Sequence, residues 1–159
     1  MTWLLKSTHL LSVSIWLGSI VFFSFFAAPA IFKTLPKETA GDVISAVISK
    51  YYLLTSAAGG IAVVTAILLG MRADERTLVE LLKTLLLMGM LTATLYAGTV
   101  LHTQIREVKV KIRTETVVED KSRFETEFKA LHKRSVILNG TTLVGAILVL
   151  TILASKIKP

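Results

Sequence analysis

Four long apolar stretches dominate the chain and leave few folds open to it. They run from about residue 3 to 32, 51 to 71, 78 to 102 and 135 to 155. A helix needs about 20 mostly apolar residues to cross the hydrocarbon core of a bilayer, and each stretch is long enough. Because lipid offers no hydrogen bonds, the backbone must form them internally, as it does in a helix or a closed β-barrel. The alternating apolar and polar pattern of barrel strands is absent. These stretches are therefore predicted to be transmembrane helices.

The composition agrees with one transmembrane domain over residues 1–159. Of these residues, 53% are hydrophobic and 18% are charged, which is too apolar for an ordinary soluble domain. The net charge is +7, but half of the Lys and Arg residues lie in one loop beside the apolar stretches. That position is typical of a cytoplasmic face near anionic lipids and does not indicate nucleic-acid binding. The absence of cysteine excludes disulfides, thiolate metal sites and a cysteine nucleophile.

The connections between the stretches differ in length and charge. Residues 33–50 are predicted to be a short polar link, and residues 72–77 a tight turn. Residues 103–134 form a charged loop that cannot enter hydrocarbon. We expect this loop to be an antiparallel helical hairpin that turns near Glu119 and Asp120. The predicted fold class is all-α, an integral membrane four-helix bundle with a long charged, helical loop between the third and fourth spans.

Two patterns support helices in this loop. Ser122-Arg123-Phe124-Glu125 has the spacing of a capping box, so the second helix of the hairpin is expected to begin there. Phe124, Phe128 and Leu131 then follow at helical spacing. Residues 108–113 alternate like a strand, but a helix is favoured because the third span can simply continue out of the membrane.

Lys and Arg are unevenly divided between the two sides of the predicted bundle. The connections 33–50 and 103–134 share one side and hold 12 of these residues, whereas the other side holds six. Positive residues are retained preferentially in the cytoplasm. The loop 103–134 is therefore expected to be cytoplasmic, with both termini outside, in the cytoplasmic membrane if the organism is prokaryotic.

Polar and small residues recur on one face of the first span and on one face of the fourth. Their spacing of three and four residues is that of a helix face. On the first span they are His9, Ser12, Trp16, Ser19 and Phe23, and on the fourth His132, Ser135, Asn139, Thr142 and Ala146. Small and polar residues hold membrane helices together. We expect an interior polar seam between the first and fourth helices, formed by His9, Ser12, Trp16, Ser135 and Asn139.

Asn139 lies four residues inside the fourth span, about 6 Å from its start at 1.5 Å per residue. Its amide has two donor hydrogens and two acceptor lone pairs to satisfy. Either a structural hydrogen bond between helices or a contact to a ligand would explain an asparagine at this depth.

The three histidines are the candidate ligands for a metal or haem, because imidazole binds haem iron, copper and zinc. His9 is expected near the outer end of the bundle, and His102 and His132 near the inner end, about 30 Å away. All three therefore cannot share one ion. His102 and His132 could meet, with Glu107 or Glu127 as further ligands. Interfacial hydrogen bonding and proton handling are the alternative roles.

No catalytic motif accompanies these residues. GxSxG, Walker A, HExxH and GxGxxG are all absent, so the sequence favours a protein that is not an enzyme. Glu80 and Lys83, three residues apart, are expected to form an ion pair at the membrane interface. They could also line a polar entrance on the outer side.

Two groups of residues carry a resemblance to a known family. The first group comprises His9-Leu10-Leu11, Trp16-Leu17-Gly18, Pro29, Phe32, Leu35-Pro36 and Ala40-Gly41, and the second comprises Phe128, Leu131, His132, Ser135 and Asn139. Together they resemble the transmembrane-protein-205-like family, small four-span proteins with a domain of uncharacterised function. That family is distantly similar to copper-resistance D-type membrane proteins and to four-helix haem proteins of porphyrin oxidation. The resemblance implies haem or a transition metal as the candidate cofactor, and a role in handling drugs or metal compounds.

The sequence leaves two functional hypotheses. The first is a non-enzymatic transport or accessory subunit built around the polar seam. The alternative is a haem- or metal-binding membrane protein engaged in redox chemistry or metal handling. The expected partners are the lipid bilayer, anionic lipids at the basic loop, and either a larger membrane complex or further copies of this chain. Nucleic acid is not among them.

Overall fold

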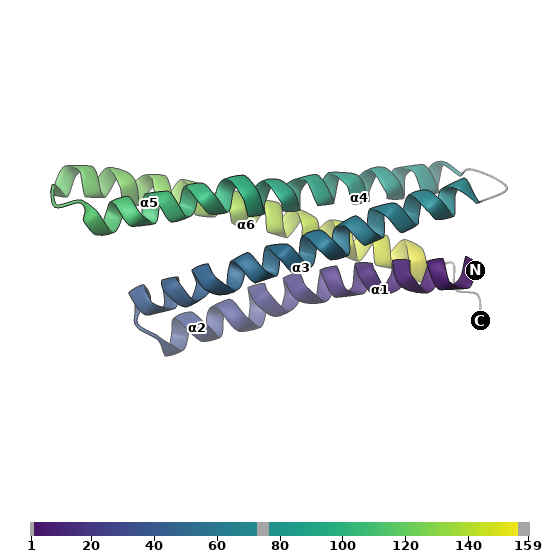
Figure 1. Ribbon diagram of the computed structural model, residues 1–159, viewed down its shortest axis with the longest axis horizontal. Helices are drawn as coiled ribbons and strands as arrows, with labels where there is room; N and C mark the ends of the chain where they lie inside the picture. Colours follow the sequence, from purple (N-terminus) through teal and green to yellow (C-terminus); the bar gives the residue numbers. More distant parts are fainter. Residues whose placement is uncertain (1, 73–76, 156–159) are drawn as a thin grey trace.

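The computed structural model describes residues 2–72 and 77–155, and every regular element in these two ranges is helical (Figure 1). The elements are α1 (Thr2–Val21), η1 (Phe22–Ala27), α2 (Ala28–Thr34), α3 (Lys37–Met71), α4 (Leu78–Tyr96), η2 (Ala97–Leu101), α5 (His102–Thr114) and α6 (Val118–Ala154). The elements η1 and η2 are π-helical turns inside longer helices. The chain thus forms four continuous rods, each apolar enough to cross a membrane. The predicted all-α four-helix fold is confirmed.

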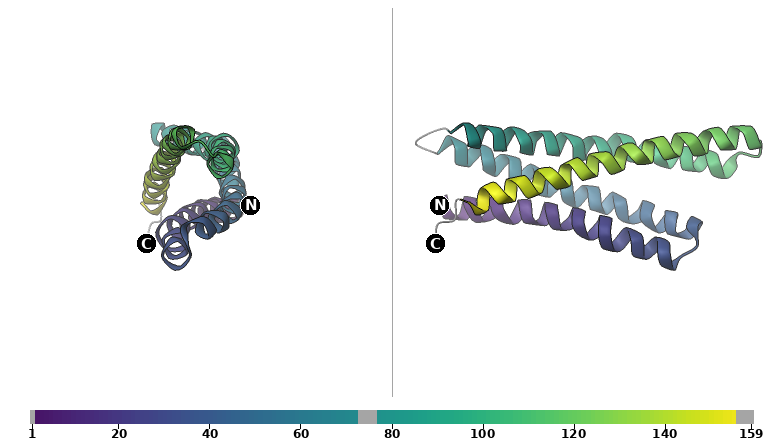
Figure 2. Two further views of the ribbon diagram at one scale, coloured as in Figure 1. Left: turned by 90° about the vertical axis from the view of Figure 1, so that its left-hand side faces the viewer. Right: turned by 180° about the vertical axis from the view of Figure 1, so that it is seen from behind.

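The four rods run alternately in opposite directions. The start of α1 and the end of α6 lie at one end of the molecule, here called the terminal end, and the α2–α3 and α5–α6 turns lie at the other, the hairpin end (Figure 1). The helices α1 and α4 each pack against both α3 and α6. One diagonal of the bundle is therefore α1 and α4, and the other is α3 and α6. Figure 2 shows that α6 crosses the bundle obliquely, from beside α5 at the hairpin end to beside α1 at the terminal end.

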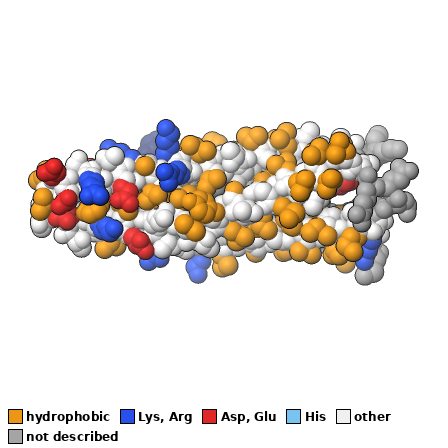
Figure 3. Space-filling view, turned by 90° about the horizontal axis from the view of Figure 1, so that it is seen from above, with side chains coloured by type: hydrophobic (Ala, Val, Ile, Leu, Met, Phe, Trp, Pro, Cys, Tyr) orange, Lys and Arg blue, Asp and Glu red, His pale blue; other side chains and the backbone are white. Residues whose placement is uncertain are grey.

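The outer surface is suited to lipid. Large apolar side chains point outward along all four rods, among them Phe22, Leu53, Leu82 and Val144. Most charged side chains gather at the hairpin end (Figure 3). A rod of 35 residues is about 52 Å long at 1.5 Å per residue, whereas the hydrocarbon core of a bilayer is about 30 Å thick. The rods therefore extend beyond the bilayer, and the protein is a small integral membrane protein.

Close packing in the core depends on small residues. Trp16 is fully buried, and a Cβ atom at Gly59 would lie only 2.9 Å from its ring. A Cβ atom at Gly145 would lie 2.7 Å from the sulfur of Met90. Glycine at these two positions lets α1 approach α3 and lets α4 approach α6, which is how membrane helices gain van der Waals contact.

The prediction of a polar link at 33–50 was wrong for most of its length. The helix α3 begins at Lys37, and only Leu35 and Pro36 interrupt the path from α2. A residue before proline is driven to extended backbone, and Leu35 has φ −112° and ψ 150°. Polar residues after Pro36 do not break the helix, because outside hydrocarbon they can line a helix as well as a loop. The second rod therefore emerges from the bilayer as continuous helix.

The charged loop is the predicted helical hairpin, but its turn comes earlier than expected. The carboxylate of Glu115 accepts hydrogen bonds from the backbone N–H groups of Thr116 and Val117, which closes the turn. The helix α6 begins at Val118, so the capping box predicted at Ser122 was wrong. Ser122 instead lies inside the helix, where its carbonyl accepts a hydrogen bond from the Thr126 hydroxyl.

The apolar stripe of this hairpin is covered by its own first helix. Phe124, Phe128 and Leu131 pack against Leu101 and Val108 of the third rod. The ammonium group of Lys111 lies 5.6 Å from the centre of the Phe124 ring, a cation–π contact.

Ion pairs also connect the hairpin to the second rod. Lys109 Nζ and Arg113 Nη2 both donate to Asp42 Oδ1, at 2.9 and 2.7 Å. These hydrogen bonds, first that of Lys109 and then that of Arg113, hold the pKa of the Asp42 carboxyl below its ordinary value. All three side chains lie beyond the apolar segments, so water screens the attraction and the contacts mainly fix orientation.

Candidate functional site

The predicted seam residues of the first rod point into the bundle. His9, Ser12 and Trp16 are buried on one face of α1. His9 Nδ1 lies 3.1 Å from the carbonyl oxygen of Ala62 and 2.9 Å from Thr65 Oγ1, both on α3. The hydroxyl of Ser12 donates to the carbonyl of His9 in its own helix. The polar contacts of His9 therefore lead to α3.

The predicted seam residues of the fourth rod also find their partners on α3. Ser135 and Asn139 are half-buried. The hydroxyl of Tyr51 donates to Asn139 Oδ1 at 2.8 Å, and the hydroxyl of Tyr52 lies 3.3 Å from Ser135 Oγ. These bonds span the α3–α6 diagonal of the bundle, which a long tyrosine side chain can bridge.

Tyr51 connects the first and fourth rods indirectly. Its ring stacks on Phe23 of η1, with ring centres 4.8 Å apart, while its hydroxyl reaches Asn139. The expected seam between these two rods thus runs through a side chain of the second rod. The reason is the oblique course of α6, which lies beside α5 at the hairpin end and reaches α1 only toward the terminal end (Figure 2).

Six side chains form what we call the tyrosine cluster: Ser49, Tyr51, Tyr52, His102, Ser135 and Asn139. Within it, the Tyr51 and Tyr52 rings meet edge to face at 5.1 Å, and the Tyr52 and His102 rings lie 6.2 Å apart. His102 Nε2 is 3.2 Å from Ser49 Oγ. The two tyrosines are buried and the other four residues are half-buried or exposed. The cluster lies where the apolar segments of its three rods end, at the hairpin side of the predicted spans.

Two π-helical turns flank this cluster. Pro29 has no N–H and its ring crowds the preceding turn, which accounts for the widened turn η1 just before it. This turn presents Phe23 to Tyr51. The second turn, η2, contains Gly98, where a Cβ atom would lie 2.9 Å from Cβ and Cγ of Tyr52. Such turns often occur at functional sites, and here both adjoin the tyrosine pair.

The three histidines have separate surroundings. His9 contacts Thr65 and His102 contacts Tyr52, positions 13 residues apart on α3, or about 20 Å along the helix. His132 is exposed, and its ring stacks on Phe128 of the same helix at 6.1 Å. Within residues 2–72 and 77–155, no group of three or more His, Asp or Glu side chains is arranged to hold one metal ion.

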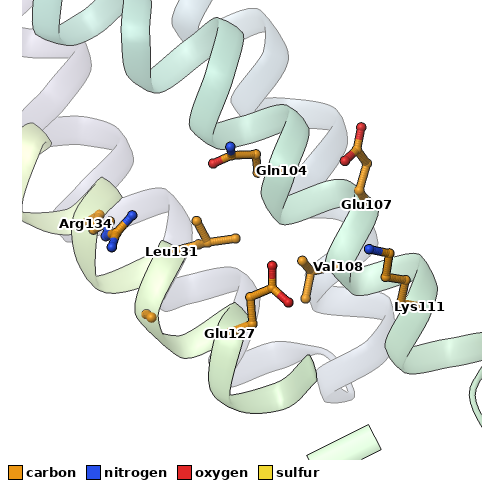
Figure 4. Close-up of a pocket in the computed structure, with 8 residues that line it drawn as sticks. Gln104, Glu107, Val108, Lys111, Glu127, Leu131 and Arg134 are labelled. Atoms are coloured by element: carbon orange, nitrogen blue, oxygen red, sulfur yellow. The ribbon is translucent and has the colours of Figure 1, made fainter. Parts of the chain in front are cut away.

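A groove of about 400 Å³ lies between the two helices of the hairpin (Figure 4). Glu107 and Lys111 line it from α5, and Glu127 and Arg134 from α6, around Val108 and Leu131. Its charged side chains are exposed and carry both signs. This is the composition of a solvated helical surface, so the groove is a weaker candidate than the tyrosine cluster.

Ionisable side chains also meet at the terminal end. The Lys83 side chain is 4% exposed and forms an ion pair with Glu80, as the i,i+3 spacing predicted. Glu80 is 25% exposed at its side chain. This pair and His9 form the second polar region inside the described part of the bundle.

Sequence reasoning missed Tyr51, Tyr52 and Ser49 as site residues. Tyrosine at the end of a membrane span is ordinarily an interfacial anchor, and that interpretation hides its role here. Two features of the sequence could have identified these tyrosines as candidate site residues. They are adjacent, so their side chains face two different neighbours. In addition, Asn139 needs a hydrogen-bond donor at the same depth.

Comparison with known proteins gives a family but no described relative. No curated protein matches the chain. No solved structure matches it either. One family model covers residues 11–114, which include most of the first rod, the second and third rods and four of the six residues of the tyrosine cluster. The chain therefore belongs to the family described as Domain of unknown function (DUF4149).

Proposed function

We propose that the protein is a non-enzymatic membrane protein of transport or accessory type, and that the tyrosine cluster contacts its ligand. One observation carries the proposal: hydrogen-bonding side chains from three rods converge at one level of the bundle, while His102, Ser135 and Asn139 stay partly accessible. Polar groups in membrane helices are costly to bury and tend to mark sites. Purely structural hydrogen bonds would not need this accessibility.

The chemistry of the cluster suits an uncharged polar or amphipathic molecule. Phenol, amide, hydroxyl and imidazole groups donate and accept hydrogen bonds without a fixed charge. The tyrosine rings add apolar surface. Ligand sites commonly combine such a surface with a few oriented polar groups, often between the helices of a bundle. The resemblance to transmembrane-protein-205-like proteins supports this class, because it implies the handling of small compounds.

Replacing Asn139 by Leu tests the proposal. The variant loses one hydrogen bond to Tyr51, which is worth about 1–2 kcal/mol or less in a membrane bundle, so it should remain folded. We expect a small molecule to accompany the wild-type protein, extracted from its own membranes in mild detergent, and to be lost from Asn139→Leu. Mass spectrometry of the molecules released on denaturation measures this. Tyr51→Phe should behave in the same way.

Thr141→Val is the matched control, because Thr141 is exposed on the same helix and its hydroxyl donates to Leu138 of that helix. This variant should keep the bound molecule. If wild type carries no enriched molecule and Asn139→Leu only lowers the melting temperature, the cluster is structural. A Soret absorption band or a stoichiometric metal in the purified protein would replace the proposal by the haem- or metal-binding alternative.

We further propose that the hairpin end faces the cytoplasm, where its basic residues would meet anionic lipids. Because the chain has no cysteine, single cysteines can report the orientation. Ser122→Cys, in the hairpin, should be protected from an impermeant thiol reagent added to intact cells. Ser155→Cys, at the terminal end, should be labelled. Both serines are exposed, so access to reagent depends on the side of the membrane. The opposite labelling pattern would reverse the orientation.

A further inference from the structure

His9 and Lys83 are both buried in the bundle, at matched depth on two different rods. The helices α1 and α4 both begin at the terminal end (Figure 1). His9 lies seven residues after Thr2 and Lys83 five residues after Leu78, which corresponds to about 10 and 8 Å along the two helices. The two helices occupy one diagonal of the bundle. Since His9 is 1% and Lys83 4% exposed, both side chains extend toward the space between the rods.

The hydrogen bonds of His9 fix its neutral tautomer. The carbonyl oxygen of Ala62 can only accept, so His9 Nδ1 must carry the hydrogen that lies between them. The Thr65 hydroxyl donates to the backbone of its own helix and can therefore also accept from Nδ1. His9 Nε2 is left with a bare lone pair. It is buried and has no hydrogen-bond partner among the described residues.

Among the described residues, only a few charged side chains come from the terminal end of the bundle. Lys83 and its partner Glu80 come from α4. On the two remaining rods, residues 53–71 of α3 and residues 140–155 at the end of the fourth rod have no Asp, Glu, His, Lys or Arg. Lys6 of α1 and Arg72 after α3 are exposed. Of the described charged side chains, Glu80 and Lys83 are therefore the ones with which an additional charge on His9 would mainly interact.

We propose that His9 Nε2 is a proton-binding site at the terminal end of the bundle, where the Glu80 carboxylate favours the bound proton and the Lys83 ammonium opposes it. An unpartnered imidazole lone pair accepts a proton from water and becomes imidazolium, and it then donates where it previously could not. A metal ion fits poorly, because the described residues supply no set of three ligands for it. The proton is the one cation that needs only a single lone pair. This site is separate from the tyrosine cluster and does not depend on its role.

Solid-state NMR of ¹⁵N-histidine-labelled full-length protein in lipid vesicles tests the proposal. The three histidine signals can be assigned by replacing His102 and His132, one at a time, by Gln. At high pH, His9 should be the neutral tautomer with hydrogen on Nδ1. On acidification, its Nε2 signal should convert reversibly to that of imidazolium.

Two variants separate a proton site from a structural histidine. Lys83→Met keeps the length of the side chain and removes the positive charge, so His9 should bind its proton at a pH higher by on the order of one unit than in wild type. Glu80→Gln removes the negative charge that favours the bound proton, and the midpoint should move in the opposite direction. A His9 that stays neutral between pH 4.5 and 8.5, or that carries its hydrogen on Nε2, would overturn the proposal. So would a midpoint that is the same in all three proteins.

Discussion

Glu80→Ala is expected to lower the free energy of unfolding by about 3 kcal/mol, because it leaves the Lys83 ammonium inside the bundle without its carboxylate partner. Removing one member of a buried ion pair costs about 3–5 kcal/mol. The lower end of that range applies here, since a quarter of the Glu80 side chain is exposed and water can reach the pair. Unfolding in mixed micelles with increasing denaturing detergent measures the change.

A double variant distinguishes this cause from a general effect of truncation. In Glu80→Ala with Lys83→Met, no buried charge is left unpaired, so most of the lost stability should return. Glu38→Ala is the control, because Glu38 is an exposed acid in the first turn of α3. It should change stability by at most about 0.5 kcal/mol. If the double variant were as unstable as Glu80→Ala alone, the ion pair would not be the cause.

The four rods could be predicted from the sequence because a membrane span depends on little more than apolar length. Charge and helical spacing likewise predicted the hairpin. Its turn was misplaced because the capping-box pattern at Ser122 outweighed Glu115, whose carboxylate closes the turn through two backbone N–H groups. A local pattern identifies a residue that can begin a helix, but tertiary packing decides whether it does.

The candidate site was less accessible to sequence reasoning. Periodicity identifies the residues that share a helix face, such as His9 with Trp16, but it does not say which neighbouring helix that face meets. The oblique course of α6 decides this, and it brings Asn139 to a tyrosine of α3. A pattern with a constant helical period cannot predict the π-helical turns either. Each of them adds a residue to one turn and so rotates the helix face that all later residues occupy.

Gly98 lies in the π-helical turn η2, where it packs against Tyr52 of the tyrosine cluster. Its replacement is expected to have the second large effect on stability. Gly98→Val should lower the free energy of unfolding by about 2 kcal/mol, as overpacking a well-packed interior does. A Cβ atom at this position would lie 2.9 Å from Cβ and Cγ of Tyr52, which are close to the backbone and cannot swing away as a flexible side-chain end would. The helix must move instead. Because Tyr52 also contacts Ser135 and His102, the displacement should spread through the tyrosine cluster.

Gly89→Val is the matched control for this prediction. Gly89 lies in the same rod, and a Cβ atom there would meet nothing within 4 Å. This variant should therefore unfold within about 0.5 kcal/mol of wild type. Denaturing-detergent titrations of the three proteins measure the difference, and tyrosine fluorescence reports whether the cluster has shifted in the folded state. Equal stability of Gly98→Val and Gly89→Val would mean that the close approach of η2 to Tyr52 contributes little, and that the tyrosine pair is held mainly by its hydrogen bonds to α6.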